Sequence, residues 1–264
     1  MQNVETKQQP HIFVRVDDQY VRRGLSEKEK RIYLTVNAAA FVINVIAEKY
    51  SALQQELYSF DADSIKQNGK LPDNAATEIN ILGATESGII VKAWDVLDWL
   101  DRLRKVLGGL AGVPKGENWK QSLRKSLESA EKVRNKIQHF DVTLNEILRK
   151  TYPPMGALLA GFPSEGHLHM RILVSTPARF ASDDSIAIAI PAFPGVLSHA
   201  DGIYLSVADE VACLSEMAKA VWDAREKFSA YIKERYQFEW PASNVSVIKK
   251  KVAIRSKNAD ATGE

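Results

Sequence analysis

Four long stretches of the chain repeat apolar residues every three or four positions, and this pattern constrains the fold more than any other feature. In the first stretch, Leu34, Phe41, Val45 and Leu57 follow that spacing. Apolar residues at such intervals share one side of an α-helix, and that side must be buried against another element. The stretches cover residues 26–58, 85–107, 119–150 and 206–236. We therefore predict four long amphipathic helices, for which an antiparallel bundle is the default arrangement.

Local signals place several ends of these helices. Ser26 and Glu29 have the spacing of a capping box, in which two side chains satisfy free backbone N–H groups at the start of a helix. Residues 59–77 are rich in Asp, Asn and Gly, and they predict a loop after the first helix. The segment Ile79–Gly83 either extends the second helix or leads into it. Pro153-Pro154 ends the third helix.

Between the third and fourth helices the apolar pattern changes to alternation with a period of two. His167–Val174 alternates in part, Ser185–Ile190 alternates strictly, and Gly202–Leu205 is a third short run. These runs predict two or three antiparallel strands. Ser206, followed by two acidic residues, is predicted to open the fourth helix. The predicted fold is therefore mainly α, an antiparallel four-helix bundle with a small antiparallel β insertion at about residues 165–206.

The predicted organisation is one domain with a flanking segment at each end. Residues 26–240 form the bundle together with its β insertion. Residues 1–25 form an N-terminal arm, in which residues 11–16 are β-prone and predict an edge strand. Residues 241–264, which include Lys249-Lys250-Lys251, form a basic tail that is predicted to be disordered.

Composition and charge restrict the class of protein. The formal net charge is +2, which is too near neutral to predict a nucleic-acid partner from charge alone. Cys213 is the one cysteine, so an intrachain disulfide is impossible, and its apolar surroundings in the sequence predict a buried, inert thiol. The most hydrophobic run, Val36–Ile46, contains two Asn residues and is too short to span a bilayer. We expect a soluble, cytoplasmic protein without membrane contact.

Arg134, Asn135 and His139 place three polar, chemically capable side chains in the third predicted helix. At about 100° per residue, Asn135 and His139 lie one turn apart on the same face, and the apolar stripe points away from them. Arg134 lies at the edge of that stripe. The pattern predicts that Asn135 and His139 face solvent or a partner, and that one chain alone does not complete a site from all three side chains.

The spacing Arg-Asn-x-x-x-His in a late helix of a small bundle resembles the HEPN superfamily, whose members carry this motif. The resemblance covers Arg134–His139 and the order of the four long helices, and it does not extend to the β insertion. It implies a helical bundle that forms homodimers. Many members of that superfamily are metal-independent endoribonucleases, including toxins and defence nucleases, and others have lost activity and act as binding or scaffold domains.

Carried onto this chain, the resemblance assigns proton transfer to His139, a phosphate clamp to Arg134 and a positioning role to Asn135. The side-chain chemistry agrees, because metal-free RNA cleavage needs a group that titrates near neutral pH and a fixed cation for phosphate. The resemblance implies no cofactor and no metal. It implies RNA and a second copy of the chain as partners, with an antitoxin or regulatory protein as a further one.

Three other interpretations of this helix remain open. The exposed face is only solvated, with Arg134 paired to Glu131 or Asp141. Alternatively, the bundle is a non-catalytic module for protein interaction. In the third interpretation the chain binds RNA without cleaving it, and the tail at residues 249–251 contributes to that binding.

Two further motifs are weaker. His167 and His169 would share one face of a strand, but Glu165 and His199 are the only additional ligands in reach, so we predict no zinc site. The glycine-rich run at residues 108–112 follows a helix and lacks the Lys-Ser/Thr pair of phosphate-binding loops, so it is predicted to be a helix end and a turn.

Overall fold

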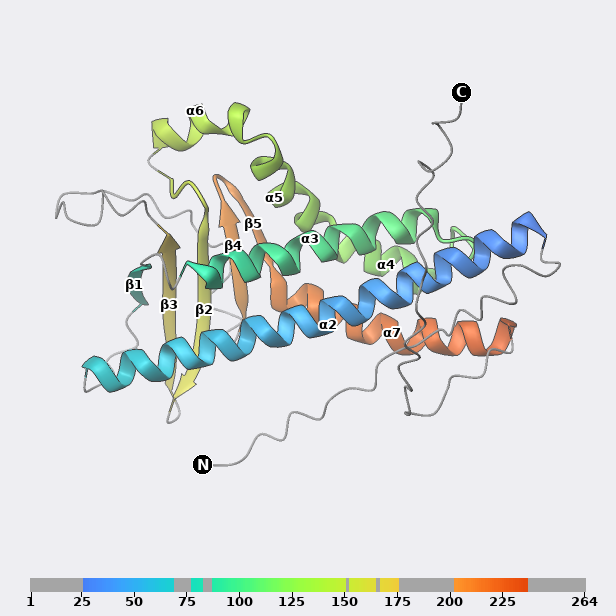
Figure 1. Cartoon of the computed structure of the whole chain (residues 1–264), viewed down its shortest axis with the longest axis horizontal. Coiled ribbons are helices and arrows are strands. Elements are labelled where there is room, and N and C mark those ends of the chain that lie inside the picture. The colour runs from blue at the N-terminus through green and yellow to red at the C-terminus, as the bar shows by residue number, and fades with distance from the viewer. Residues whose placement is uncertain are drawn as a thin grey trace, which may run out of the picture.

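The computed structural model describes residues 26–68, 77–82, 87–150, 152–164, 167–175 and 202–236. Within these residues, long helices run side by side through the molecule and a sheet stands against one end of them (Figure 1). The elements are, in chain order, α2 (Glu27–Asn68), β1 (Thr77–Leu82), α3 (Gly88–Gly109), α4 (Asn118–Ser126), α5 (Glu128–Gln138), α6 (Phe140–Lys150), β2 (Ala157–Ser164), β3 (His167–Ser175), β4 (Ile203–Val207), β5 (Glu210–Cys213) and α7 (Leu214–Tyr236). The predicted N-terminal arm, the predicted strand at 185–190 and the predicted basic tail lie outside the described residues.

Helix α2 begins where it was predicted and ends later. The Ser26 backbone N–H donates to Glu29 Oε2 at 2.8 Å, and the Glu29 N–H donates to Ser26 Oγ at 3.4 Å, which confirms the capping box. The helix then continues to Asn68, through residues that we predicted to be a loop. This extension makes a tertiary contact, in which Asp61 accepts a hydrogen bond at 2.7 Å from Arg171 Nε of β3, and both side chains are largely buried.

The described strands form one sheet with the order β1-β3-β2-β4-β5. β1 pairs in parallel with β3, and all other neighbours pair antiparallel. β3 and β4 confirm two of the predicted strands. The segment that we expected to extend or lead into the second helix is a strand up to Leu82, because it pairs with β3. β2 was not predicted, since it contains Gly161 and Pro163, which are typical of turns. Because β1 precedes α3 in the chain, the sheet is more than an insertion between the third and fourth helices.

The helices do not form the predicted four-helix bundle. α2, α3 and α7 lie together, and the third predicted helix is divided into α4, α5 and α6 (Figure 1). One face of the sheet contributes Leu158, Leu173 and Leu205 to the same buried core as Ile46 of α2 and Leu97 of α3. The sheet is therefore a layer of the main core, and the molecule is a mostly helical protein with a small, largely antiparallel sheet.

The stretch predicted as one helix over residues 119–150 is interrupted twice. Leu127 separates α4 from α5 with φ −96° and ψ 3°, and His139 separates α5 from α6 with φ −107° and ψ 45°. The stretch contains neither Gly nor Pro, so the sequence carries no local signal for either break. The second break also changes which side of the chain is buried, since Leu144, predicted to lie in the apolar stripe, is exposed.

The fourth helix begins at Leu214, eight residues after the predicted start at Ser206. Ser206 is fully buried inside β4, Glu210 begins β5, and α7 starts only at Leu214. The two strands form a hairpin whose turn includes Ala208 at φ 52°, a conformation that residues other than glycine rarely adopt. Strand pairing has therefore prevailed over the helix-start signal, and α7 extends to Tyr236, where the description of this segment stops.

Helix α2 is long and apolar enough over Glu27–Asp61, among the described residues, to cross a membrane by length and composition alone. Helices in the core of a soluble protein pass the same test. Val36, Ile46 and Leu53 of α2 are completely buried in the main core. One side of α2 is thus buried inside this protein, whereas Leu34 and Phe41, which we predicted to lie on the buried side, are 56% and 60% exposed.

Gly156, just before β2, occupies a position that suits only glycine. Its φ is +83°, and a Cβ at this residue would lie 2.3 Å from the carbonyl oxygen of Ser206 in β4. We expect Gly156→Ala to lower the free energy of unfolding by roughly 2 kcal/mol or more, because the backbone and the contact with β4 would both be strained. Gly116→Ala is the matched control, since nothing lies within 4 Å of its Cβ position. Chemical denaturation compares the two variants, and equal stabilities would contradict the prediction.

Candidate functional site

A buried carboxylate on α3 meets Arg134 of α5 at the centre of the candidate site. Asp101 is 0% exposed. Arg134 Nη1 donates to Asp101 Oδ2 at 3.1 Å, and Arg134 Nε donates to Asp98 Oδ1 at 2.6 Å. The Arg134 guanidinium is thus turned toward α3 and held by two carboxylates, and it is partly buried. Two of its five N–H donors are used in these contacts.

Two further cations on α3 surround the same carboxylate. Arg104 donates to Asp101 Oδ1 from both Nε and Nη2, and Lys105 Nζ lies 2.7 Å from Asp101 Oδ2. Arg104 also reaches Glu131 of α5, so the predicted pairing of Arg134 with Glu131 is replaced by pairs with Asp98 and Asp101. Burial by itself raises the pKa of Asp101, but the hydrogen bonds from Lys105 and Arg104 outweigh it and bring the pKa below its ordinary value.

Asn135 and His139 lie on the other side of α5. Both are exposed, as their distance from the apolar stripe predicted. The His139 N–H donates to the carbonyl of Asn135 at 3.0 Å, and the His139 carbonyl accepts the N–H groups of Val142 and Thr143. His139 is therefore the junction residue at which α5 ends and α6 begins. The structure brings Asn135 and His139 to one exposed surface and turns the Arg134 guanidinium away toward α3.

Lys136, inside the motif, connects the α5–α6 junction to neighbouring elements through ion pairs. Its ammonium lies 3.0 Å from Glu146 of α6 and 2.8 Å from Asp209 in the β4–β5 turn. Lys150 reaches the second oxygen of Glu146 at 3.1 Å. The hydrogen bond to Asp209 raises the pKa of Lys136, which is partly offset by burial and reinforced by Glu146. These contacts fix the orientation of α6 relative to α5, and with it the backbone at His139.

Asp98 and Asp101 were not among the predicted site residues. A signal was present, since Asp101 follows Leu97 by four residues and Leu100 by one, inside an apolar stripe. A carboxylate in such a position requires cationic partners once it is buried. Arg104 and Lys105 lie three and four residues after Asp101. Nothing in the local pattern identifies Arg134, which lies 33 residues after Asp101, as a further partner.

Other candidate sites receive no support from the described residues. No group of three or more His, Cys, Asp or Glu side chains among them is arranged to hold a metal ion. His167 and His169 lie in β3, but their side chains, like Glu165 and His199, lie outside the description. Cys213 is the last residue of β5 rather than part of a helix, and burial raises the pKa of its thiol. A raised pKa reduces the thiolate fraction, so the thiol is a poor nucleophile.

Comparison of the chain with models of known protein families, with curated proteins and with solved structures finds no match. The geometry alone therefore indicates the chemistry of the site. An exposed imidazole and amide lie one turn apart, and the neighbouring Arg134 is anchored to two carboxylates of α3 through two of its five N–H donors.

The lowered pKa of Asp101 makes part of the stability of the protein dependent on pH. A carboxylate with a lower pKa in the folded state stabilises the fold above its unfolded pKa of about 4, and that contribution is lost as the pH falls through the folded value. We expect Asp101→Asn to be less stable than the wild type near neutral pH, and the difference to narrow as the pH falls below about 4. Urea denaturation at each pH measures this difference. The exposed Asp141→Asn is the control, and a difference for Asp101→Asn that is independent of pH would contradict the assignment.

Proposed function

We propose that this chain is an HEPN-like, metal-independent endoribonuclease of a toxin or defence system, with a composite active site at a homodimer interface. The observation that carries the proposal is the exposed pair of Asn135 and His139 at the α5–α6 junction, with Arg134 fixed on the preceding position. His139 is exposed and therefore accessible to RNA, and the ion pairs of Lys136 hold the helix end that carries it.

The proposed reaction uses groups on RNA and on this chain alone. His139 accepts the proton of a 2′-hydroxyl while the 2′-oxygen attacks the adjacent phosphorus. The bond to the 5′-oxygen breaks, and the His139 imidazolium gives its proton to that oxygen, so the products are a 2′,3′-cyclic phosphate and a 5′-hydroxyl. Arg134 offers N–H donors to the phosphate oxygens as charge develops on them, and Asn135 orients the phosphate or the imidazole by a hydrogen bond.

A second copy of the chain is proposed because one copy separates the motif. The Arg134 guanidinium is turned toward α3, whereas Asn135 and His139 point outward. A two-fold axis near His139 would place two imidazoles and two Asn135 amides around one cleft. Arg134 would reach a phosphate in that cleft only after leaving its contacts with Asp98 and Asp101. The adjoining α6 fits such a contact, since its Val142 side chain is 72% exposed.

A cleavage assay tests the enzymatic proposal. We expect the purified protein to cut single-stranded or loop RNA in the presence of EDTA, and His139→Ala to lower the rate by about a hundredfold or more, since proton transfer contributes about that much. Gln138→Ala is the matched control, because Gln138 is exposed and next to His139. Cyclic phosphate ends, detected by chromatography, identify the mechanism. Inactive wild type, or equal rates for both variants, would show that the surface is not catalytic.

The dimer is tested separately from the chemistry. We expect Val142→Asp to shift the protein toward monomer, measured by size-exclusion chromatography with light scattering, and to reduce cleavage in parallel, because a charge would be buried in the contact. Val91→Asp on α3 is the control, since Val91 is 59% exposed and lies on another helix. A monomeric wild type that cleaves RNA would refute the composite site.

A non-catalytic module for protein interaction or RNA binding is the second candidate function. One observation favours it, namely that Asp98 and Asp101 already occupy two donors of Arg134. Carboxylates beside a guanidinium reduce its attraction for phosphate, so Arg134 would then be a structural residue. If this is the function, we expect His139→Ala to leave partner binding unchanged and Val142→Asp on the exposed surface of α6 to abolish it.

A further inference from the structure

The loop between α3 and α4, residues 110–117, is hydrogen-bonded to three helices, α2, α4 and α7. The Ala111 N–H donates to Thr35 Oγ1 of α2 at 3.1 Å, and the Tyr231 hydroxyl of α7 donates to the Gly112 carbonyl at 3.0 Å. Lys120 of α4 donates to the carbonyls of Leu110 and Val113, each at 3.4 Å. Gly112 has a φ of 78°, which glycine adopts without strain. The loop is therefore built by tertiary contacts and not only by the helix-end signal that the sequence contains.

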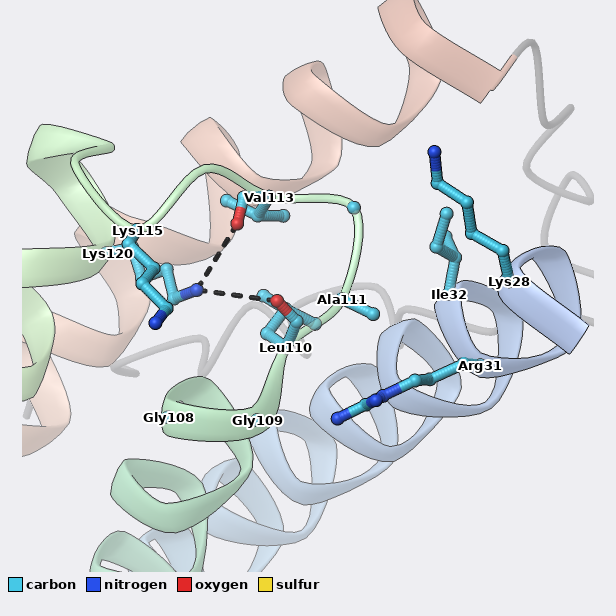
Figure 2. Close-up of a pocket in the computed structure, with 11 residues that line it drawn as sticks. Lys28, Arg31, Ile32, Gly108, Gly109, Leu110, Ala111, Val113, Lys115 and Lys120 are labelled. Atoms are coloured by element: carbon cyan, nitrogen blue, oxygen red, sulfur yellow. Dashed lines mark hydrogen bonds between the residues drawn. The ribbon is translucent and has the colours of Figure 1, made fainter.

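A pocket with a volume of 340 Å³ lies between this loop and the first turns of α2 (Figure 2). Its size is within the range of small-molecule sites. Every charged side chain that lines it is a cation, and no carboxylate contributes to the lining. Arg31 extends from α2 toward the loop, and Lys115 and Lys120 lie on the loop's other side (Figure 2). Apolar side chains, including Ile32 and Val113, complete the walls.

Lys120 is the cation that distinguishes this pocket from a solvated surface. It is 3% exposed, and within the residues that the structure describes its ammonium has two long hydrogen bonds, both to backbone carbonyls. Within the described part of the chain, no ion pair involves Lys120, Arg31 or Lys115. Burial lowers the pKa of Lys120, and the positive charges of Arg124 and Lys115 lower it further. A buried ammonium in a cationic environment is stabilised when an anion binds beside it.

Phosphate is the anion that these groups suit best. Arginine and lysine donate charge-assisted hydrogen bonds to phosphate oxygens, the arginine through two parallel N–H groups. The apolar walls fit the organic part of a phosphorylated molecule, which a bare inorganic ion does not have. We propose that the pocket between α2 and the α3–α4 loop binds the phosphate group of a small phosphorylated molecule, such as a nucleotide. This site is separate from the Asn135–His139 surface, and the proposal does not depend on RNA cleavage.

Titration calorimetry with ATP and with pyrophosphate tests the site on the full chain. We expect both probes to bind the wild type, and Arg31→Glu and Lys115→Glu each to weaken binding about tenfold or more, since each loses a charge-assisted hydrogen bond and gains a repulsive charge. Both positions are exposed, so the fold is retained, which thermal melting verifies. Lys219→Glu on α7 makes the same change of charge at an exposed position outside the pocket, and we expect no effect.

Three results would overturn the proposal. The first is no binding of either probe by the wild type at concentrations up to about 10 mM. The second is equal weakening by Lys219→Glu, which would mean that general attraction of anions explains the binding. The third comes from a 2′-O-methyl RNA oligonucleotide, which cannot be cleaved through its 2′-oxygens. If this oligonucleotide binds in a manner sensitive to Arg31→Glu while ATP and pyrophosphate do not bind, the pocket serves a nucleic-acid backbone instead.

Discussion

The carboxylate of Asp101 has to be neutralised inside the protein, because a buried charge without partners costs several kcal/mol. Arg104 and Lys105 come from its own helix, but Arg134 comes from α5. The pair therefore holds α5 against α3 with Arg134 turned inward. Since the next residue on a helix points about 100° away, Asn135 is turned outward, and His139 follows one turn later. The buried carboxylate thus decides which face of the motif is exposed.

A second buried ion pair acts in the same way at the far end of α2. Asp61 and Arg171 are 110 residues apart, and their contact joins the last turns of α2 to the middle of β3. Such pairs add little net stability, since desolvation offsets most of the attraction, but they are costly to break and so specify one arrangement. Together the two pairs place the sheet and α5 relative to the long helices.

Two groups of cations in this protein differ in whether carboxylates lie beside them. Arg134 and Arg104 lie among carboxylates and connect helices. Arg31, Lys115 and Lys120 lie around a pocket without a carboxylate in its lining. The first arrangement satisfies charge within the chain, whereas the second leaves a positive field that an external anion can satisfy. Charge composition alone, with a formal net charge of +2, shows neither arrangement.

Local sequence signals determined the start of α2, the strands around residues 170 and 205, and the outward direction of Asn135 and His139, because capping, alternation and helical spacing act within a few residues. Contacts between distant segments decided the rest. Strand pairing converted the predicted helix start at Ser206 into a hairpin, and Arg171 of β3 pairs with Asp61, beyond the predicted end of the first helix. The break at His139 and the partners of Arg134 likewise come from α3, α6 and the β4–β5 turn. Such partners lie far away in the chain, so only the tertiary structure could identify them.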